Sequence, residues 1–212
     1  MSQKIVIIDY GMCNLGSVRR AFEECGASDA IVSSDFRDLA SADKIILPGV
    51  GAFTKGMQNL KAGGWIEPLR EAALDKKIPL LGICLGMQLL SDKGFEGGEI
   101  EGLGLISGEV RKLESKKNST SKIKERIPHM GWNEVHHDQK SILFDDIQSG
   151  TDFYFVHSYY FLPKDNKSTI GQTPYCGKFS SVIGSENIFG VQFHPEKSQK
   201  PGFQLIRNFL RF

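Results

Sequence analysis

The sequence predicts an α/β protein with a mostly parallel central sheet, flanking helices and additional antiparallel strands in its C-terminal half. Short β-branched apolar runs alternate with stretches of helical spacing as far as Leu90, which is typical of parallel strands covered on both faces. From Gly102 onward, strand-like pieces are separated by turn residues. A chain of 212 residues without an internal repeat or linker is expected to form a single domain over residues 1–212.

The composition excludes several classes of protein. Apolar residues make up 40% of the chain and charged residues 24%, with a formal net charge of +1. Neither intrinsic disorder nor a strongly basic nucleic-acid surface is therefore indicated. The first apolar run, Ile5 to Ile8, is too short for a secretion signal or a membrane span. This balance of apolar and charged residues favours a protein that acts on small molecules or binds a protein partner. Binding to nucleic acid or to a membrane is not expected.

The cysteines indicate a reducing, cytoplasmic setting. They are scattered, without the spacing of a disulfide framework or a zinc site, at Cys13, Cys25, Cys84 and Cys176. Neither a metal nor another cofactor is expected.

The N-terminal half shows the local signatures of strand, turn and helix. A β-branched strand runs from Lys4 to Asp9, and apolar residues then recur at helical spacing from Leu15 until Gly26. The other elements expected here are strands at 30–33 and 44–47, a helix over about 54–74, and a strand at 80–84 followed by an amphipathic helix. Sites in such sheets gather at the carboxyl ends of the strands.

In the C-terminal half, strands are expected at 108–113, 151–161 and 180–183, with a turn at 184–187 and a closing helix from Pro201. We expect these strands as antiparallel additions to the same sheet. The basic segment from Arg111 to Arg126 is interpreted as a solvated loop or hairpin tip. A partner-contacting patch is the alternative, and the near-neutral overall charge makes nucleic acid a poor explanation for it.

Cys84 stands in the most informative segment of the chain, Gly82-Ile-Cys-Leu-Gly-Met-Gln88. An apolar run ends on this cysteine, and Gly86 and Gln88 open the next helix. At a helix N-terminus, unpaired backbone N–H groups favour a thiolate and can receive a developing oxyanion. On these residues alone, a buried cysteine that packs as a small hydrophobe is an equal alternative.

A histidine and a carboxylate near the other end of the chain strengthen the catalytic interpretation. In an extended His194-Pro195-Glu196 segment, side chains two residues apart point to the same side. His194 and Glu196 are therefore expected to form one hydrogen-bonded line toward Cys84, as base and orienting group. Either residue alone would more simply be a loop histidine or a solvated charge.

The glycines of Pro48-Gly49-Val50-Gly51 supply a third requirement of such a site. They tolerate the positive φ that aims a backbone N–H at developing negative charge. An ordinary tight turn after a strand is the alternative.

These residues resemble the class I (triad) glutamine amidotransferase family, through segment 82–88 and His194-Pro-Glu196. More narrowly, the chain resembles the glutaminase subunits of imidazole glycerol phosphate synthases over nearly its whole length. The segments that carry this closer resemblance are 9–11, 48–51, 154–160, 193–198 and Pro128-His-Met-Gly-Trp-Asn133. The last of these is the subfamily discriminator.

The resemblance implies roles for individual residues. Cys84 would be the nucleophile, His194 the general base and acid, and Glu196 its orienting partner. Gly51 and the backbone N–H of Leu85 would form the oxyanion hole, and the Val50–Gly51 peptide is hypothesised to reorient to complete it.

Glutamine would be held by Gln88, Ser158 and Tyr159, the last two at the end of a strand. On the residues alone, Gln88 fits equally well as a polar group on a helix face and Ser158 as an ordinary strand serine.

The resemblance also implies a partner. Members of this subfamily form a heterodimer with a (β/α)8-barrel cyclase of histidine biosynthesis, which receives the ammonia through an internal tunnel and whose substrate switches on the glutaminase. Trp132 and Asn133 are candidates for the partner-facing surface, against the alternative of a half-buried tryptophan that fills the core.

One position departs from the family pattern. Relatives usually read Asp-Tyr-Gly-x-Gly-Asn, whereas this chain has Asp9-Tyr-Gly-Met-Cys-Asn14, with Cys13 at the glycine position. A parallel subfamily that feeds ammonia to a sugar amidotransferase of surface-polysaccharide (LPS) synthesis is therefore kept as an alternative. A non-catalytic regulatory module and a cysteine hydrolase acting on other substrates are the remaining alternatives.

Overall fold

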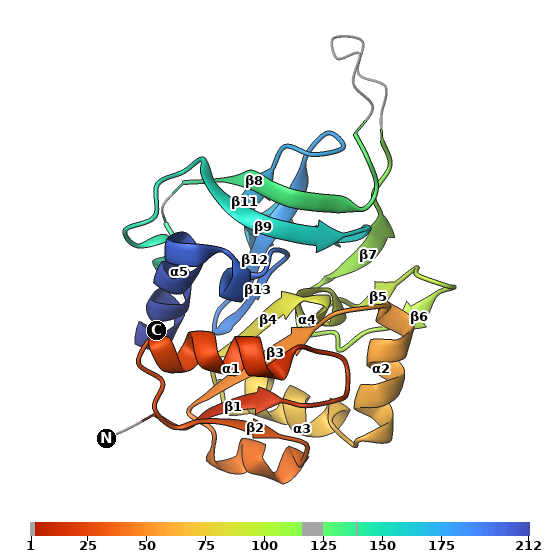
Figure 1. Cartoon of the computed structure of the whole chain (residues 1–212). Helices are drawn as coiled ribbons and strands as arrows, with labels where there is room; N and C mark the ends of the chain where they lie inside the picture. The colour runs from red at the N-terminus through yellow and green to blue at the C-terminus, as the bar shows by residue number, and fades with distance from the viewer. Residues whose placement is uncertain (1–2, 116–124, 139) are drawn as a thin grey trace.

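The computed structural model describes residues 3–115, 125–138 and 140–212 (Figure 1). In this part of the chain, nine strands form one large mixed sheet. Their spatial order is β2 (Ala30–Ser33), β1 (Ile5–Ile8), β3 (Lys44–Gly49), β4 (Leu80–Cys84), β13 (Ile188–Val191), β12 (Phe179–Ser185), β11 (Thr169–Thr173), β8 (His129–His137) and β9 (Thr151–His157). Pairings from β2 to β13 are parallel and those from β13 to β9 are antiparallel. The predicted fold class is confirmed.

Helices cover both faces of the parallel strands, because successive residues of a buried strand point to opposite sides. Ile5 and Ile7 pack in the core under α1 (Leu15–Glu24) and α5 (Gln199–Arg211). Val6 and Ile8 pack in the opposite core under α2 (Phe53–Ala62), α3 (Ile66–Arg70) and α4 (Leu85–Leu89). None of the described helices is long and apolar enough to cross a membrane.

A second, smaller sheet corrects the expectation that all later strands join the first one. It contains four of the described strands, in the order β10 (Tyr159–Pro163), β7 (Gly108–Lys112), β5 (Lys93–Gly94) and β6 (Ile100–Glu101). The expected strand 151–161 is divided between the two sheets, with β9 ending at His157 and β10 beginning at Tyr159. The break at Ser158 lets the chain leave one sheet and join the other.

Two helix predictions also need correction. The single helix expected over 54–74 is divided into three elements. The first, α2, ends at Ala62, because Gly64 adopts a φ of +71°; α3 and the π-helical turn η2 (Glu71–Asp75) follow it. The helix after Cys84 is only five residues long and buried on all sides, so it is not amphipathic. The remaining short turns are 3₁₀ helices: η1 (Phe36–Ser41), η3 (Ile142–Phe144), η4 (Asn166–Ser168) and η5 (Pro195–Lys197).

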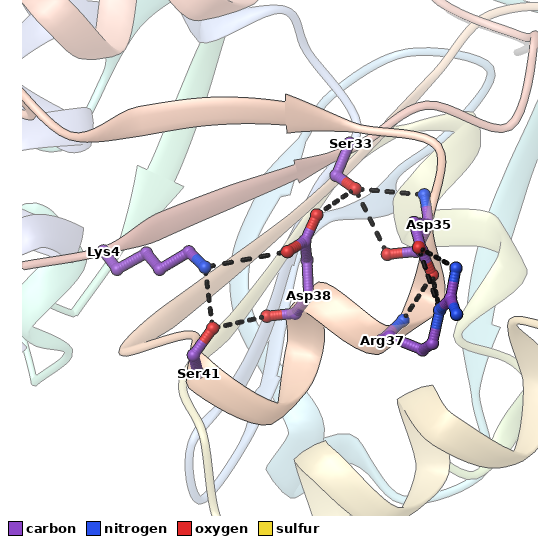
Figure 2. A network of polar contacts seen from close by, with 6 residues as sticks. All are labelled: Lys4, Ser33, Asp35, Arg37, Asp38 and Ser41. Atoms are coloured by element: carbon purple, nitrogen blue, oxygen red, sulfur yellow. Dashed lines mark hydrogen bonds and ion pairs between the residues drawn. The ribbon is translucent and has the colours of Figure 1, made fainter.

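Polar side chains fix the outer edge of the parallel sheet at β2 and η1 (Figure 2). The Ser33 hydroxyl donates to the Asp38 carboxylate over 2.6 Å, and Lys4 Nζ donates to Ser41 Oγ over 2.7 Å. The Asp35 carboxylate caps η1 by accepting from the backbone N–H of Arg37. We call these residues the surface network; its members are Lys4, Ser33, Asp35, Arg37, Asp38 and Ser41.

The basic segment between Arg111 and Arg126 lies only partly in the described structure. Residues 116–124 fall outside the described residues, so the loop prediction stays a prediction there.

Candidate active site

Three neighbouring parallel strands bring the predicted site residues together at their carboxyl ends. In the register of the sheet, Gly49 of β3 lies opposite Cys84 of β4, and Val191 of β13 lies opposite Ile83. The segments that follow β3 and β13 therefore flank Cys84 on its two sides. This edge of the sheet is where the sequence predicts the site.

Cys84 occupies a strained turn between β4 and α4. Its φ of 54° and ψ of −107° lie in a region that non-glycine residues rarely adopt, and such strain concentrates at functional sites. The flanking glycines make the turn possible. A Cβ at Gly82 would lie 2.8 Å from the backbone of Gly86, and one at Gly86 would lie 1.7 Å from the carbonyl oxygen of Leu47. The Gly-x-Cys-x-Gly pattern is thus required by close backbone packing.

His194 and Glu196 form the expected buried pair. His194 Nδ1 donates to Glu196 Oε1 over 2.8 Å, and their side chains are 2% and 4% exposed. The expectation of an extended segment was wrong, because Pro195 begins the 3₁₀ turn η5. His194 itself keeps β geometry and donates its backbone N–H to the Tyr154 carbonyl of β9.

The protonation of His194 reflects its two partners. Burial by itself lowers the pKa of the imidazole, but hydrogen bonding to Cys84 and Glu196 raises the pKa to about 10 overall. Among the described residues, His194 Nε2 has no partner that meets hydrogen-bond geometry, and such contacts in ligand-free active sites often tighten only around a substrate. The raised pKa favours a protonated imidazole between the sulfur and the carboxylate, which is the form that base-activated cysteine chemistry uses.

A cavity of about 400 Å³ opens beside the thiol. It is lined by Val50, Gly51, Ala52, Cys84, Leu85, Gln88, Glu96, Pro128, Val156, His157, Ser158 and Tyr159. Its volume and mix of apolar and polar walls suit a small polar molecule. A larger cavity of about 590 Å³ lies near Cys25 and Arg207, away from Cys84 and His194, and we give it no role in the chemistry.

The predicted glutamine-binding residues all line this cavity. Gln88 is 4% exposed, and its Nε2 donates both to the Tyr159 carbonyl over 2.8 Å and to Gln192 Oε1 over 3.0 Å. Ser158 lies at the break between β9 and β10. Glu96, which the sequence analysis missed, also reaches the cavity wall. One of its oxygens accepts from the backbone N–H of Phe53 at the start of α2, 2.7 Å away.

The segment after β3 contains a glycine in the left-handed backbone region, and the reorientation expected of it stays a prediction. Gly51 has a φ of +110°, in the region that favours glycine. The backbone N–H of Val50 donates to the Met12 carbonyl over 2.6 Å, so this N–H is engaged outside the cavity. Gly49 is required by packing, since a Cβ there would lie 2.2 Å from the Tyr10 hydroxyl oxygen.

Trp132 and Asn133 lie on β8 at the side of the site. Trp132 is 47% exposed and contacts the Tyr154 ring edge-on, so the alternative of a core tryptophan is wrong. Met130, on the same strand, is 64% exposed. Asn133 faces inward, with its Nδ2 3.3 Å from His129 Nε2.

Cys13 is accommodated without strain. It is not among the described residues with a left-handed backbone, so its turn does not require the glycine expected there. The half-buried thiol lies 4.0 Å from the Ile8 carbonyl, and burial, with the nearby Asp9 charge, raises the pKa of the thiol to about 12.

A buried histidine pair was missed by the sequence analysis. His129 and His157 stand directly opposite each other on β8 and β9, and His129 Nδ1 lies 3.0 Å from His157 Nε2. The signature Pro-His-Met-Gly-Trp-Asn contained the first of them, but only the strand register pairs it with the second. No cluster of histidine, cysteine and acidic side chains suited to a metal ion occurs among the described residues.

The fold and the Cys84, His194 and Glu196 constellation define a class of protein, which sequence comparison identifies. Residues 6–211 match the family described as glutamine amidotransferase class-I, and the chain belongs to that family.

More particular relatives agree over the full length. The chain is 48% identical to "Imidazole glycerol phosphate synthase subunit HisH 1" of Campylobacter jejuni strain RM1221, over 98% of this chain and 99% of that protein. It is 45% identical to "Imidazole glycerol phosphate synthase subunit HisH" of Moorella thermoacetica, over 97% and 93% of the two chains.

Solved structures agree with the fold. A glutamine amidotransferase from Thermotoga maritima superposes with a TM-score of 0.67 at 16% identity, covering 100% of this chain and 84% of that one. PurLQS from Thermotoga maritima gives a TM-score of 0.69 at 17% identity, covering 100% and 99%.

Proposed function

We propose that this protein is the glutaminase subunit of an imidazole glycerol phosphate synthase, which hydrolyses glutamine to glutamate and ammonia and passes the ammonia to a partner subunit. The observation that carries the proposal is the strained Cys84 turn facing the buried His194–Glu196 pair beside a cavity of suitable size. The names of the full-length relatives support the same activity.

The first chemical step uses the thiolate of Cys84. Its sulfur attacks the side-chain amide carbon of glutamine, and a tetrahedral intermediate forms with negative charge on oxygen. The backbone N–H groups of Leu85 and of the segment at Gly51 stabilise this charge. His194 then donates its proton to the departing nitrogen, the C–N bond breaks, and ammonia leaves with a γ-glutamyl thioester on Cys84.

In the second step, water hydrolyses the thioester. His194, now neutral, takes a proton from the attacking water, and Glu196 holds the Nδ1–H so that Nε2 is the basic nitrogen. Collapse of the second tetrahedral intermediate breaks the C–S bond and releases glutamate. The Cys84 thiolate is restored beside the protonated His194.

The oxyanion hole is completed by a change in the segment after β3. In this structure the Val50 N–H is bound to the Met12 carbonyl, and the adjoining Val50–Gly51 peptide has the glycine freedom to turn. This arrangement supports a resting state that is switched on when the partner responds to its own substrate.

The partner in this proposal is a (β/α)8-barrel cyclase of histidine biosynthesis, contacted through the exposed Trp132. Asn133 faces inward and is not part of the proposed contact. A docked partner would receive the ammonia before it becomes ammonium at neutral pH and loses its nucleophilicity. The names of the relatives reported above favour this pathway over the surface-polysaccharide alternative. We further propose that residues 1–212 act as one domain, with the cytoplasmic location expected from the cysteines.

The test is glutamate release by the complex with the cyclase, with and without the ribonucleotide substrate of the cyclase. Cys84→Ser is expected to abolish release while leaving the circular dichroism spectrum and co-purification with the cyclase unchanged. Cys176→Ser, a half-buried thiol outside the cavity, serves as the matched control and should keep full activity. Glutamate release retained in Cys84→Ser would contradict the role of Cys84 as nucleophile. Glutamate release that does not change when the ribonucleotide substrate of the cyclase is added would contradict the proposed pathway.

A further inference from the structure

Gln192 is a buried residue beside the reacting sulfur. The strand register places Val191, the last residue of β13, opposite Ile83 of β4. Gln192 follows β13 directly and therefore lies beside Cys84, the last residue of β4. Gln192 is 0% exposed, and its Nε2 lies 3.7 Å from Cys84 Sγ. We propose that Gln192 is a further catalytic residue, whose side-chain amide donates a hydrogen bond to the Cys84 thiolate. The inference rests on the proposed function of Cys84 as nucleophile.

The orientation of the Gln192 amide follows from a backbone carbonyl. The Tyr159 carbonyl can only accept hydrogen bonds, so the Gln88 atom 2.8 Å from it must be Nε2. The same Gln88 nitrogen is 3.0 Å from Gln192, which must therefore present its oxygen to Gln88. The other end of the Gln192 amide, the N–H end, then faces the sulfur.

The backbone carbonyl of Val156, another polar neighbour of the sulfur, cannot serve this purpose. The Val156 carbonyl oxygen lies 3.9 Å from Cys84 Sγ and attracts the proton of a thiol. When that proton has moved to His194, the carbonyl no longer has a partner on the sulfur. A thiolate in a buried site needs donors, and the Gln192 amide is an uncharged donor already in place.

Two neutral histidines support the Tyr159 carbonyl that sets the orientation of the Gln88 and Gln192 amides; one contacts the carbonyl directly and the other contacts the first histidine. His157 Nδ1 donates to the same carbonyl over 2.8 Å, and its Nε2 is left to accept from His129 Nδ1. His129 Nε2 in turn accepts from the Asn133 amide. We call this sequence of groups the buried chain; it runs through Asn133, His129, His157, Tyr159, Gln88, Gln192 and Cys84.

The sharpest test replaces only the last donor of the buried chain. In Gln192→Glu, one carboxylate oxygen still accepts from Gln88, while the other replaces the N–H that faced the sulfur. Alkylation of Cys84 by iodoacetamide in the full chain is followed by mass spectrometry of its peptide between pH 5 and 10. The pH of half-maximal rate should rise by about one unit or more, corresponding to a roughly tenfold lower thiolate fraction near neutrality.

Gln192→Leu separates the missing donor from the added charge. It keeps the approximate side-chain volume, and the pH of half-maximal alkylation should still rise by roughly 0.5 to 1 unit, as expected for one hydrogen bond to a charged group. The control is Asn208→Leu, since Asn208 is equally buried and donates to Leu143 and Asp145 carbonyls instead. It should lower thermal stability without moving the alkylation profile.

The wild-type titratable groups around the sulfur stay in place in all three variants, and they are Tyr10, Glu96, His157, His194 and Glu196. Gln192→Glu adds one carboxyl group to them, and Gln192→Leu shows the effect without that group. A Gln192 variant that folds and keeps the wild-type midpoint would overturn the proposal. A change confined to the Gln192 variants would support it.

Wild-type protein provides a reading that does not depend on the folding of any variant. The side-chain amide protons of Gln192, observed by NMR, should shift with the same pH midpoint as the alkylation of Cys84, and an amide signal unaffected by that titration would overturn the proposal. Wild-type glutamate release in the complex is measured in parallel. If release is absent, the proposed function fails; if it is present while the Gln192 readings are unchanged, only this inference fails.

Discussion

The surface network at the edge of the sheet and the buried chain beside Cys84 use similar hydrogen bonds in opposite surroundings. The surface network contains formal charges, and its Arg37–Asp35 ion pair, with N–O distance 2.6 Å, has side chains that are 80% and 42% exposed (Figure 2). The buried chain, up to the thiol, contains amides, imidazoles and a backbone carbonyl.

The difference shows how the protein manages buried polarity near its reactive group. An uncompensated buried charge is costly, whereas neutral donors and acceptors can be buried when each one is matched. Burial lowers the pKa of His129 to about 4 and that of His157 to about 3, which keeps both imidazoles neutral. Charge is thereby reserved for the His194, Glu196 and Cys84 group, where the proposed chemistry uses it.

The largest expected effect comes from changing one atom of the buried His194–Glu196 pair, to which the proposed function gives a catalytic role. In Glu196→Gln, an amide nitrogen can donate to His194 Nδ1 and stabilise the wrong tautomer, so kcat for glutamine hydrolysis in the complex should fall by about 10³-fold. The exposed pair of Arg19 and Glu23, 2.7 Å apart, provides the control. Glu23→Gln should leave kcat unchanged, and a Glu196→Gln enzyme within threefold of wild type would contradict the assigned role.

Acid should destabilise the buried chain before it affects the surface network. The pKa of His129 is lowered from 6.5 to about 4 by burial, so between these pH values the unfolded chain binds more protons and unfolding is favoured as pH falls. The loss should reach about 3 kcal/mol for His129 by pH 4.

Asp35 of the surface network loses its stabilising effect only at lower pH. A hydrogen bond from Arg37 lowers the pKa of Asp35 from 3.8 to about 2, so its contribution is present above pH 3.8 and is lost as pH falls through 2. Urea unfolding at pH 7, 5.5 and 4 measures the loss of unfolding free energy that is due to His129. An unfolding free energy that does not change over this range would argue against neutral buried histidines.

His129→Phe should break the buried chain while keeping the ring in its stack between Phe155 and Tyr175. His157 Nε2 and the Asn133 amide each lose a partner, which should cost about 2 kcal/mol of unfolding free energy. Urea unfolding at pH 7 measures the cost. The pH dependence between 7 and 4 should also become shallower than in wild type, because one of the titrating groups is absent. Wild-type pH dependence in this variant would contradict the assignment to His129.

The smallest effect is expected in the surface network. Asp35→Ala removes a helix-capping carboxylate and an exposed ion pair, and the loss of unfolding free energy should be smaller than that of His129→Phe. Added salt should reduce the difference between the variant and wild type, because the pair is exposed to solvent. Thermal melts at low and high salt measure both quantities, and a loss as large as that of His129→Phe would remove the distinction between the two networks.

Local signals in the sequence were sufficient for the nucleophile turn. Gly82, Cys84 and Gly86 lie within five consecutive residues, and the backbone contacts that require both glycines are made at that turn and with the adjacent strand. The His194–Glu196 pair was also predictable, although the backbone geometry proposed for it was wrong, because two residues in sequence are close in space in either an extended segment or a 3₁₀ turn. The roles assigned to these residues stay predictions.

Signals for the long-range parts of the site were weak. The apolar alternation over 151–161 gave no indication that Ser158 separates two sheets. Gln192 follows an apolar strand without any local motif, and its position beside Cys84 comes from the register between β13 and β4. His129 meets His157 through the register between β8 and β9 in the same way.

The sequence by itself determined the parallel α/β half of the fold, the strained turn at Cys84 and the pairing of His194 with Glu196. Each of these depends on residues near one another in the chain, whose spacing restricts the backbone directly. Only the tertiary structure decided the division into two sheets, the cavity walls and the buried chain that ends at Gln192. Those features arise where strands distant in sequence pair in one register, and a shift of one residue would turn the same side chains to the opposite face.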